Sequence, residues 1–170
     1  SLLAIGEDIF LHIGPQIKCD KPFLILASEF GCSILQHIDP VIQQDKELVF
    51  AIVRRNPAEL CHASSAYQED REFLCRVAKC NGMILAFVQM AQRNDPELVW
   101  FALHQNGLAL EHAPAPFRND KRMVLAAITQ NSRALQHASL QLRDDRDVVQ
   151  KALSFGMDGL EFASLRIQRS

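Results

Sequence analysis

Five of the six histidines occupy one position of a 25-residue repeat, and a repeated histidine could do chemistry. They are His12, His37, His62, His112 and His137. Imidazole is the commonest metal ligand and titrates near neutral pH, so converging rings could form a metal centre or a set of general acids and bases. Phe87 and Phe162 stand at the same position in other repeats, which favours packing of a flat ring over coordination.

The expected spacing of these rings argues against a metal centre. Equivalent residues on adjacent packed helices lie about 8–10 Å apart. Two zinc ligands with Zn–N bonds of about 2.0–2.1 Å can be separated by no more than about 4 Å. We therefore expect the histidines to pack against their own repeats, and we expect neither a metal ion nor another cofactor.

A second column consists of aspartates at intervals of 25 residues. They are Asp20, Asp45, Asp70, Asp95, Asp120 and Asp145. Such carboxylates could bind cations or transfer protons, but acid–base catalysis needs paired groups in a pocket. An aspartate directly before an apolar-periodic segment is instead typical of a helix N-cap, so we expect these side chains to accept from N–H groups of the first turn.

The cysteines add no catalytic motif. They are odd in number, lack a Cys-x-x-Cys pair and fall at five different repeat positions: Cys19, Cys32, Cys61, Cys75 and Cys80. This usage is typical of reduced thiols in a cytoplasmic protein. No phosphate loop, zincin motif or nucleophile elbow is present. We therefore expect that the chain is not an enzyme.

Composition excludes further classes of function. The 170 residues are 48% hydrophobic and 22% charged, which is too apolar for a disordered chain. The net charge of −2 provides no basic field for nucleic acid. No apolar run reaches the ~18–20 residues of a membrane span, and no signal peptide is evident. We expect a protein partner, no nucleic acid and no membrane span.

A small basic patch is the candidate partner-binding site. It comprises residues nine or ten positions after an aspartate of the column, namely Arg54, Arg55, Lys79 and His104. The alternative explanation is that cations in the last turn of a helix interact favourably with the helix dipole.

The elements that position these residues follow from the repeat itself. Six 25-residue repeats start at residues 20, 45, 70, 95, 120 and 145, and a partial repeat covers residues 1–19. In these repeats apolar residues lie three, four, seven and eight positions after the aspartate, with Ser28 as the one exception, which is the pattern of one helical face. A leucine, a ring and a small or branched apolar residue recur further on, as in Leu110, His112 and Ala113.

This pattern predicts two short helices per repeat. An Asn-Gly step, such as Asn106-Gly107, should end the first helix in a left-handed cap. A second helix of about two turns should follow, and a short polar link such as Arg118-Asn119 should lead to the next aspartate. The predicted fold is all-α: a right-handed α-solenoid, or superhelix, of helix-turn-helix repeats that forms a single domain over residues 1–170.

Residues 95–149 carry a resemblance to a known family. Their pattern runs from Asp95-Pro96-Glu97-Leu98-Val99 through Gln105-Asn106-Gly107 to Asp120-Lys121-Arg122-Met123-Val124. It resembles a repeat family described as a domain of unknown function (family number 4116). The resemblance implies a scaffold without catalytic residues, and a relation to proteins that intracellular bacteria deliver into host cells.

The expected function is therefore a protein–protein interaction scaffold in the cytoplasm. Because the sequence starts within a repeat, we expect a fragment of a larger protein, such as a secreted bacterial effector acting in the host cytosol. The alternative is a regulatory or substrate-docking module of an enzyme whose catalytic domain lies outside this chain.

Overall fold

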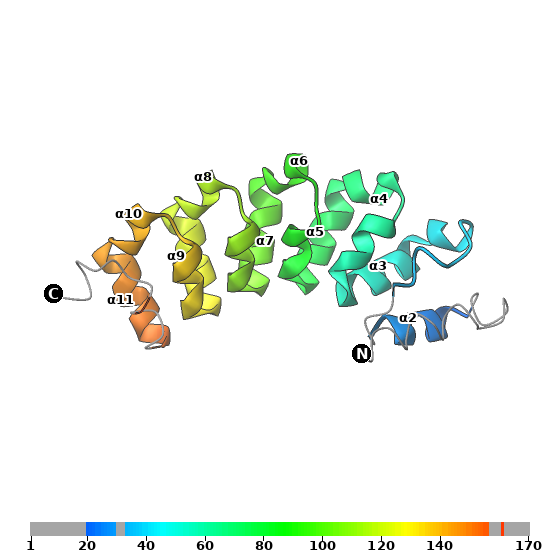
Figure 1. The fold of residues 1–170 in the computed structure, drawn as a ribbon, viewed down its shortest axis with the longest axis horizontal. Helices are drawn as coiled ribbons and strands as arrows, with labels where there is room; N and C mark the ends of the chain where they lie inside the picture. Colours follow the sequence, from blue (N-terminus) through cyan, green and yellow to red (C-terminus); the bar gives the residue numbers. More distant parts are fainter. Residues whose placement is uncertain (1–19, 30–32, 157–160, 162–170) are drawn as a thin grey trace. The chain divides into compact units, whose positions relative to one another are not determined.

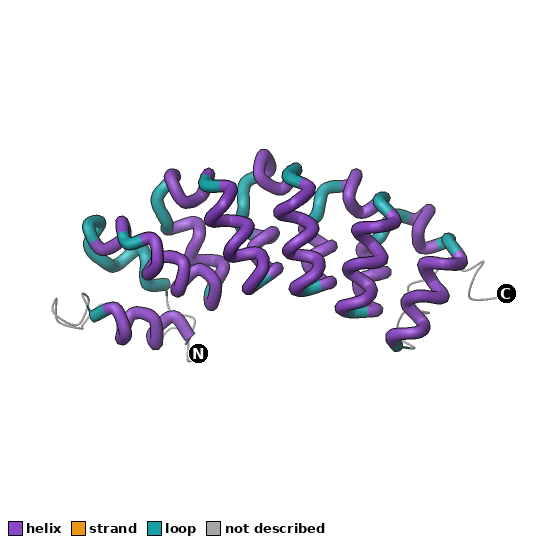
Figure 2. Tube along the Cα trace, turned by 180° about the vertical axis from the view of Figure 1, so that it is seen from behind, coloured by secondary structure: helices purple, strands orange, loops and turns teal. Residues whose placement is uncertain are grey.

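A computed structural model describes residues 20–29, 33–156 and 161 of the chain. Within these residues every regular element is a helix and no strand occurs (Figure 2). This confirms the predicted all-α class. The partial repeat over residues 1–19, with His12 and Cys19, lies outside the described residues, as do Cys32 and Phe162.

The chain divides into two compact units, Ser1–Val77 and Ala78–Ser170, which are described separately (Figure 1). The first contains α2 (Lys21–Glu29), η2 (Ile42–Gln44), α3 (Lys46–Arg55), η3 (Pro57–His62) and α4 (Ser65–Glu69). Helix α5 (Arg71–Cys80) contains the boundary. The second contains η4 (Gly82–Ala86), α6 (Met90–Arg93), α7 (Pro96–Gln105), η5 (Gly107–His112), α8 (Ala115–Arg118), α9 (Lys121–Gln130), η6 (Ser132–His137), α10 (Leu140–Arg143) and α11 (Arg146–Phe155).

Each 25-residue repeat opens with an α-helix that an aspartate caps. Asp120 accepts from the N–H groups of Arg122 and Met123, and Asp145 accepts from those of Asp147 and Val148. The predicted apolar face is buried: in α7, Leu98, Val99, Ala102 and Leu103 are at most 2% exposed. The prediction of N-caps followed by an amphipathic helix is confirmed.

The second helix of the repeat is a 3-10 helix, and the role of the Asn-Gly step differs from the predicted one. Asn106 has φ −146° and ψ 108°, an extended conformation, and its side chain accepts from the Leu108 N–H. It therefore ends α7 and caps η5 at the same time. The prediction of a left-handed cap was wrong, because the side-chain cap of the following helix requires an extended residue.

The glycine is required by a close approach between repeats. A Cβ on Gly107 would lie 2.1 Å from the backbone oxygen of Ala127, and one on Gly82 would lie 2.2 Å from that of Ala102. Gly82 also donates its N–H to the Gln105 side-chain oxygen at 2.6 Å. The start of each of these 3-10 helices therefore packs directly on the first helix of the next repeat.

A third short helix replaces the predicted polar link. Helices α4, α6, α8 and α10 each contain four or five residues. At the end of α6, Arg93 donates to the carbonyl oxygens of Val88 at 2.9 Å and Ala86 at 2.8 Å. At the same position of an earlier repeat, Gln68 donates to Ala63 at 2.8 Å. The third helix thus carries a side chain that satisfies carbonyl groups at the end of the 3-10 helix.

The repeats of the second unit stack side by side. Helix α7 contacts α9, α9 contacts α11, and η5 contacts both η4 and η6 (Figure 1). The flanks of α7 are accordingly half-buried at Trp100 and Phe101. Such stacking of units too small to bury their own cores is the defining property of an α-solenoid. The handedness of the superhelix stays a prediction.

Candidate functional site

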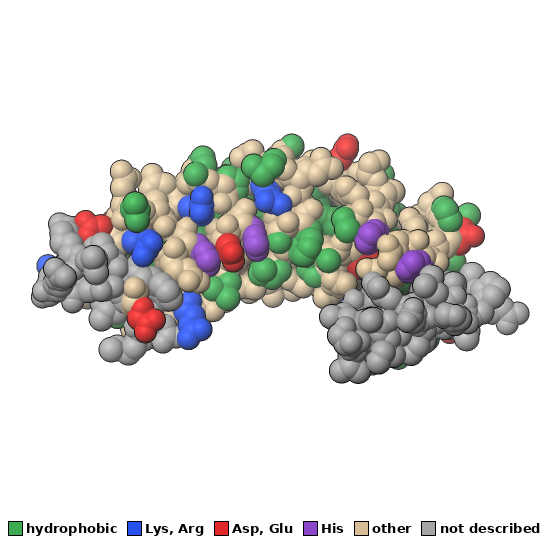
Figure 3. Space-filling model, viewed as in Figure 1, with side chains coloured by type: hydrophobic (Ala, Val, Ile, Leu, Met, Phe, Trp, Pro, Cys, Tyr) green, Lys and Arg blue, Asp and Glu red, His purple; other side chains and the backbone are tan. Residues whose placement is uncertain are grey.

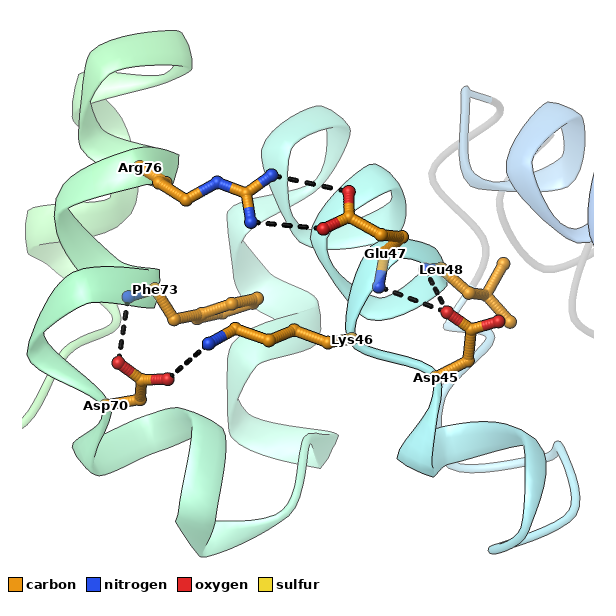
Figure 4. A network of polar contacts seen from close by, with 7 residues as sticks. All are labelled: Asp45, Lys46, Glu47, Leu48, Asp70, Phe73 and Arg76. Carbon is orange, nitrogen blue, oxygen red and sulfur yellow. Dashed lines mark hydrogen bonds and ion pairs between the residues drawn. The ribbon is translucent and has the colours of Figure 1, made fainter.

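A ladder of ion pairs links consecutive repeats through the N-cap aspartates. In the first unit, Lys46 Nζ lies 2.7 Å from Asp70 Oδ2, while Asp70 Oδ1 accepts from the Phe73 N–H at 3.0 Å (Figure 4). Lys21 pairs with Asp45 in the same way. In the second unit, Lys121 Nζ contacts Asp145 at 2.9 Å and Asp147 at 3.0 Å. The lysine that follows one aspartate therefore binds the aspartate of the next repeat.

These contacts set the protonation of the aspartates. The hydrogen bond from Lys46 holds the pKa of Asp70 below its ordinary value, and the Phe73 N–H acts in the same direction. Lys21 and Lys121 do the same to the pKa values of Asp45 and Asp145. These carboxylates are ionised near neutral pH, so they serve as acceptors and are poorly suited to proton transfer.

Aromatic rings on the helix flanks receive cations. Arg76 forms a two-point contact with the Glu47 carboxylate at 3.1 and 3.3 Å, and its guanidinium lies 4.3 Å from the Phe50 ring centroid. In the second unit, Lys79 Nζ lies 4.0 Å from the centroid of Phe101. These cation–π contacts tie a side chain of one repeat to a ring of a neighbouring repeat.

The four residues of the predicted basic patch are divided between the two units. Arg54 lies 5.8 Å from the Phe50 centroid, and Arg55 donates to the Ala51 carbonyl at 3.3 Å. Lys79 lies on Phe101, as described above, and the ring of His104 is 4.1 Å from that of Trp100. Local contacts of this kind account for part of each cation's position, and partner binding through them stays a prediction.

The described members of the histidine column are half-buried rings: His62, His112 and His137 end 3-10 helices, and His37 lies in a turn. His137 Nε2 lies 4.0 Å from Glu111 Oε2, and burial lowers the pKa of His137. Figure 3 shows two histidines with an acidic side chain between them on the face of the second unit. Among the described residues, no three His, Cys, Asp or Glu side chains are grouped as metal ligands.

Glu59 is a buried carboxylate that the sequence analysis missed. It is 0% exposed, and its Oε2 accepts from the N–H groups of Ile34 at 3.0 Å and Leu35 at 2.8 Å. Asn56, Asn81, Asn106 and Asn131 cap the 3-10 helices of the later repeats. The first repeat has Gly31 in place of this asparagine, and Glu59 of the next repeat supplies an acceptor there. The sequence signal for this site is that Glu59 stands at a repeat position that holds isoleucine or alanine in most other repeats.

A surface pocket of about 320 Å³ lies between α7 and α9 in the second unit. Its lining consists of Pro96, Glu97, Trp100, Asp120, Arg122 and Met123. It occurs where the lysine ladder is interrupted, since Pro96 occupies the position that Lys46 and Lys121 hold in their repeats. Pro96 suits the first position of α7, where its missing N–H costs nothing, but it leaves the ladder without a cation at this point.

Large apolar side chains are exposed on the short third helices. Met90, the first residue of α6, is 64% exposed, and Leu140, the first residue of α10, is 78% exposed. Phe87, just before α6, is 42% exposed. In Figure 3, hydrophobic side chains gather along the edge of the second unit where α6 and α8 lie. We call Phe87, Met90 and Leu140 the apolar edge.

No helix in the described part of the chain combines the length and the apolar character needed to cross a bilayer. No curated protein and no solved structure shows significant similarity to the chain. A family model described as Domain of unknown function (DUF4116) matches residues 45–89, 95–143 and 120–168. These matches follow the 25-residue register and cover more than half of the sequence. The chain belongs to the DUF4116 family of helical repeats.

Proposed function

We propose that the chain is a protein-binding scaffold without catalytic activity of its own. The apolar edge is the observation that carries this proposal. Met90 and Leu140 begin α6 and α10, expose most of their side chains and contribute little to the core. Tandem repeats present such side chains at regular intervals, and extended surfaces of this kind are how solenoid proteins bind their partners.

Two further aspects of the proposal rest on the family resemblance and on composition. The scaffold would be part of a secreted bacterial effector and would act in the cytosol of the host cell. Its partner would be a protein and not a nucleic acid, since the net charge is −2. A titration with RNA and DNA at low salt tests the latter: micromolar affinity that falls steeply with salt would contradict it.

Capture of partners with matched variants tests the binding surface. The double variant Met90→Asp/Leu140→Asp places charges on the apolar edge. The control Ala91→Asp/Gln141→Asp adds the same charges to exposed positions of the same two helices. We expect proteins recovered from host-cell cytosol by the wild-type chain to be lost with the first variant and retained by the second.

Quantitative mass spectrometry of the captured proteins is the measurement, and circular dichroism confirms that both variants are folded. Equal recovery by the two variants would overturn the apolar edge as the binding surface. In a separate arm, charge reversal at Arg54, Arg55 and Lys79 tests the basic patch. Unchanged recovery there would remove those residues from the proposal.

A further inference from the structure

The pocket between α7 and α9 is the place where a built-in cation is missing. The residue after the column aspartate is a lysine or arginine in every repeat except one: Lys21, Lys46, Arg71, Pro96, Lys121 and Arg146. In Lys21, Lys46 and Lys121, the Nζ atom binds the carboxylate of the aspartate that starts the next repeat. Pro96 has no charged group, so the ladder provides nothing for Asp120.

Asp120 is left with one oxygen available for a partner. Its Oδ1 accepts from the N–H groups of Arg122 at 2.8 Å and Met123 at 3.3 Å, as expected of an N-cap. No ion pair to Asp120 forms within the part of the chain that the structure describes. In the equivalent Asp70, Oδ1 fills the capping role and Oδ2 binds the lysine. Asp120 therefore retains the oxygen that its counterpart uses for a lysine.

The rest of the pocket matches the other parts of a lysine side chain. Trp100 and Met123 provide an apolar wall for the methylene groups, and an indole face attracts an ammonium group. Arg122 also lines the pocket; its side chain is exposed, and its guanidinium is 6.0 Å from the Trp100 centroid, at the outer limit of a cation–π contact. Glu97 also lines the pocket but already has a contact of its own, so the oxygen available to a ligand is that of Asp120.

We propose that this pocket binds the side chain of a lysine from the partner protein. The inference rests on the proposed protein-binding function and specifies the chemistry of the partner. Lysine fits better than arginine, because one available oxygen accepts from a compact ammonium but cannot form the two-point contact that guanidinium prefers. A free divalent cation fits poorly, since calcium takes six to eight oxygen ligands.

A titration of the chain with short peptides tests the proposal without the natural partner. The probes are acetyl-Gly-Lys-Gly-amide and two analogues with arginine or norleucine in place of the lysine. Each peptide is added up to millimolar concentration while 1H–15N correlation spectra of the chain are recorded. We expect the lysine peptide to shift the Trp100 indole N–H and the backbone N–H signals of residues 120–123. The arginine peptide should bind more weakly, and the norleucine peptide should have no saturable effect.

Three variants separate the pocket from the fold. Pro96→Lys restores the ladder and fills the site from within, while Pro96→Ala removes the proline and leaves the site empty. Asp120→Asn keeps an N-capping side chain and removes the charge. We expect lysine-peptide affinity to fall about fivefold or more in Pro96→Lys and Asp120→Asn, the scale of one ion pair, and to be unchanged in Pro96→Ala.

Equal shifts with lysine and norleucine peptides would overturn the proposal, as would undiminished lysine binding by Pro96→Lys and Asp120→Asn. The result is distinguishable from failure of the proposed function. Loss of the apolar edge as a binding surface would be seen in partner capture, whereas the peptide titration reports on the pocket alone.

Discussion

At the residue scale, two side-chain choices in this chain are determined by the neighbouring repeat. Gly107 has no Cβ because the Ala127 carbonyl of the next repeat occupies that space. Glu59 is buried because two backbone N–H groups of the preceding repeat require an acceptor. Each is set by a contact about one repeat away in sequence, so each can be tested by a substitution of one residue.

The first prediction concerns the close approach at Gly107. The variant Gly107→Ala should lower the free energy of unfolding by about 1–3 kcal/mol, because a Cβ 2.1 Å from the Ala127 oxygen forces the two backbones apart. Alanine also restricts the unfolded chain, which favours folding by about 0.4–1 kcal/mol, less than the cost of the clash. Urea unfolding followed by circular dichroism measures the difference.

Ser132 provides the matched control, since it stands at the same repeat position and already carries a Cβ in a buried site. Ser132→Ala should change the free energy of unfolding by less than about 1 kcal/mol. If Gly107→Ala were as stable as Ser132→Ala, the glycine would not be there for the close approach.

The second prediction is a pH dependence that originates from Glu59. Burial raises the pKa of this carboxyl above its ordinary value, while the Leu35 and Ile34 N–H groups and the charge of His62 act in the opposite direction. A raised folded-state pKa means that the contribution to stability is present below the unfolded value of 4.5 and is lost as pH rises through the folded value. Glu59→Gln keeps an acceptor for both N–H groups and does not titrate.

Urea unfolding at a series of pH values checks this. We expect the wild-type chain to lose stability relative to Glu59→Gln as the pH rises above 4.5. The effect of the ladder aspartates falls in another window: because their pKa values are lowered, their stabilisation is lost below 3.8. A constant difference between the two proteins from pH 4 to 8 would contradict a raised pKa at Glu59.

At the scale of an element, the first helices α3, α5 and α11 begin after an aspartate that also binds a lysine of the preceding repeat. Asp145 caps α11 through the Asp147 and Val148 N–H groups and accepts from Lys121. The third prediction separates these roles. Asp145→Ala should cost about 0.5–2 kcal/mol of stability, the range for loss of an N-cap, while Asp145→Asn should cost less because the amide oxygen still caps the helix.

Thermal or urea unfolding near pH 7 measures both variants. Because the ion pair holds the pKa of Asp145 below its ordinary value, the stabilisation from its charge declines as the pH falls below 3.8, so the difference between the wild type and Asp145→Asn should shrink in acid. Equal stability losses for Asp145→Ala and Asp145→Asn at pH 7 would instead mean that the ion pair to Lys121, and not the cap, carries the effect.

The first helices could be predicted from sequence because their signals are local. An aspartate, an acidic first turn and apolar residues at three, four, seven and eight positions act within one helix, and α7 follows all of them. The 3-10 helix and the third helix could not be assigned this way. Four-residue helices such as α8 carry too few residues for a periodic pattern, and the extended conformation of Asn106 depends on the helix that it caps.

The candidate sites likewise depend on contacts between repeats that the sequence does not show. The basic patch was inferred from charge and repeat position, whereas the ring beneath Lys79 comes from the next repeat and is visible only in the structure. The pocket at Pro96 was readable in principle, because a proline interrupts a column of lysine and arginine. It required knowledge that this column binds the following aspartate, which no spacing in the sequence shows.

At the scale of the whole molecule, the prediction of a single domain can be tested against the two compact units. The boundary lies within α5, and a helix forms cooperatively along its length. We therefore expect one cooperative transition. Trp100, the only tryptophan of the chain, reports on the second unit by fluorescence, while far-UV circular dichroism reports on all helices.

A core substitution in the first unit makes the test decisive. Ile52 in α3 is fully buried, so Ile52→Val should lower stability by about 0.5–1.5 kcal/mol. If the repeats unfold as one domain, the urea midpoint of Trp100 fluorescence must fall together with that of circular dichroism, although the substitution lies in the other unit. In a repeat array, a destabilised repeat affects the others through the coupling between neighbours. An unchanged Trp100 midpoint would therefore show that this coupling is lost at α5 and that the two units unfold independently.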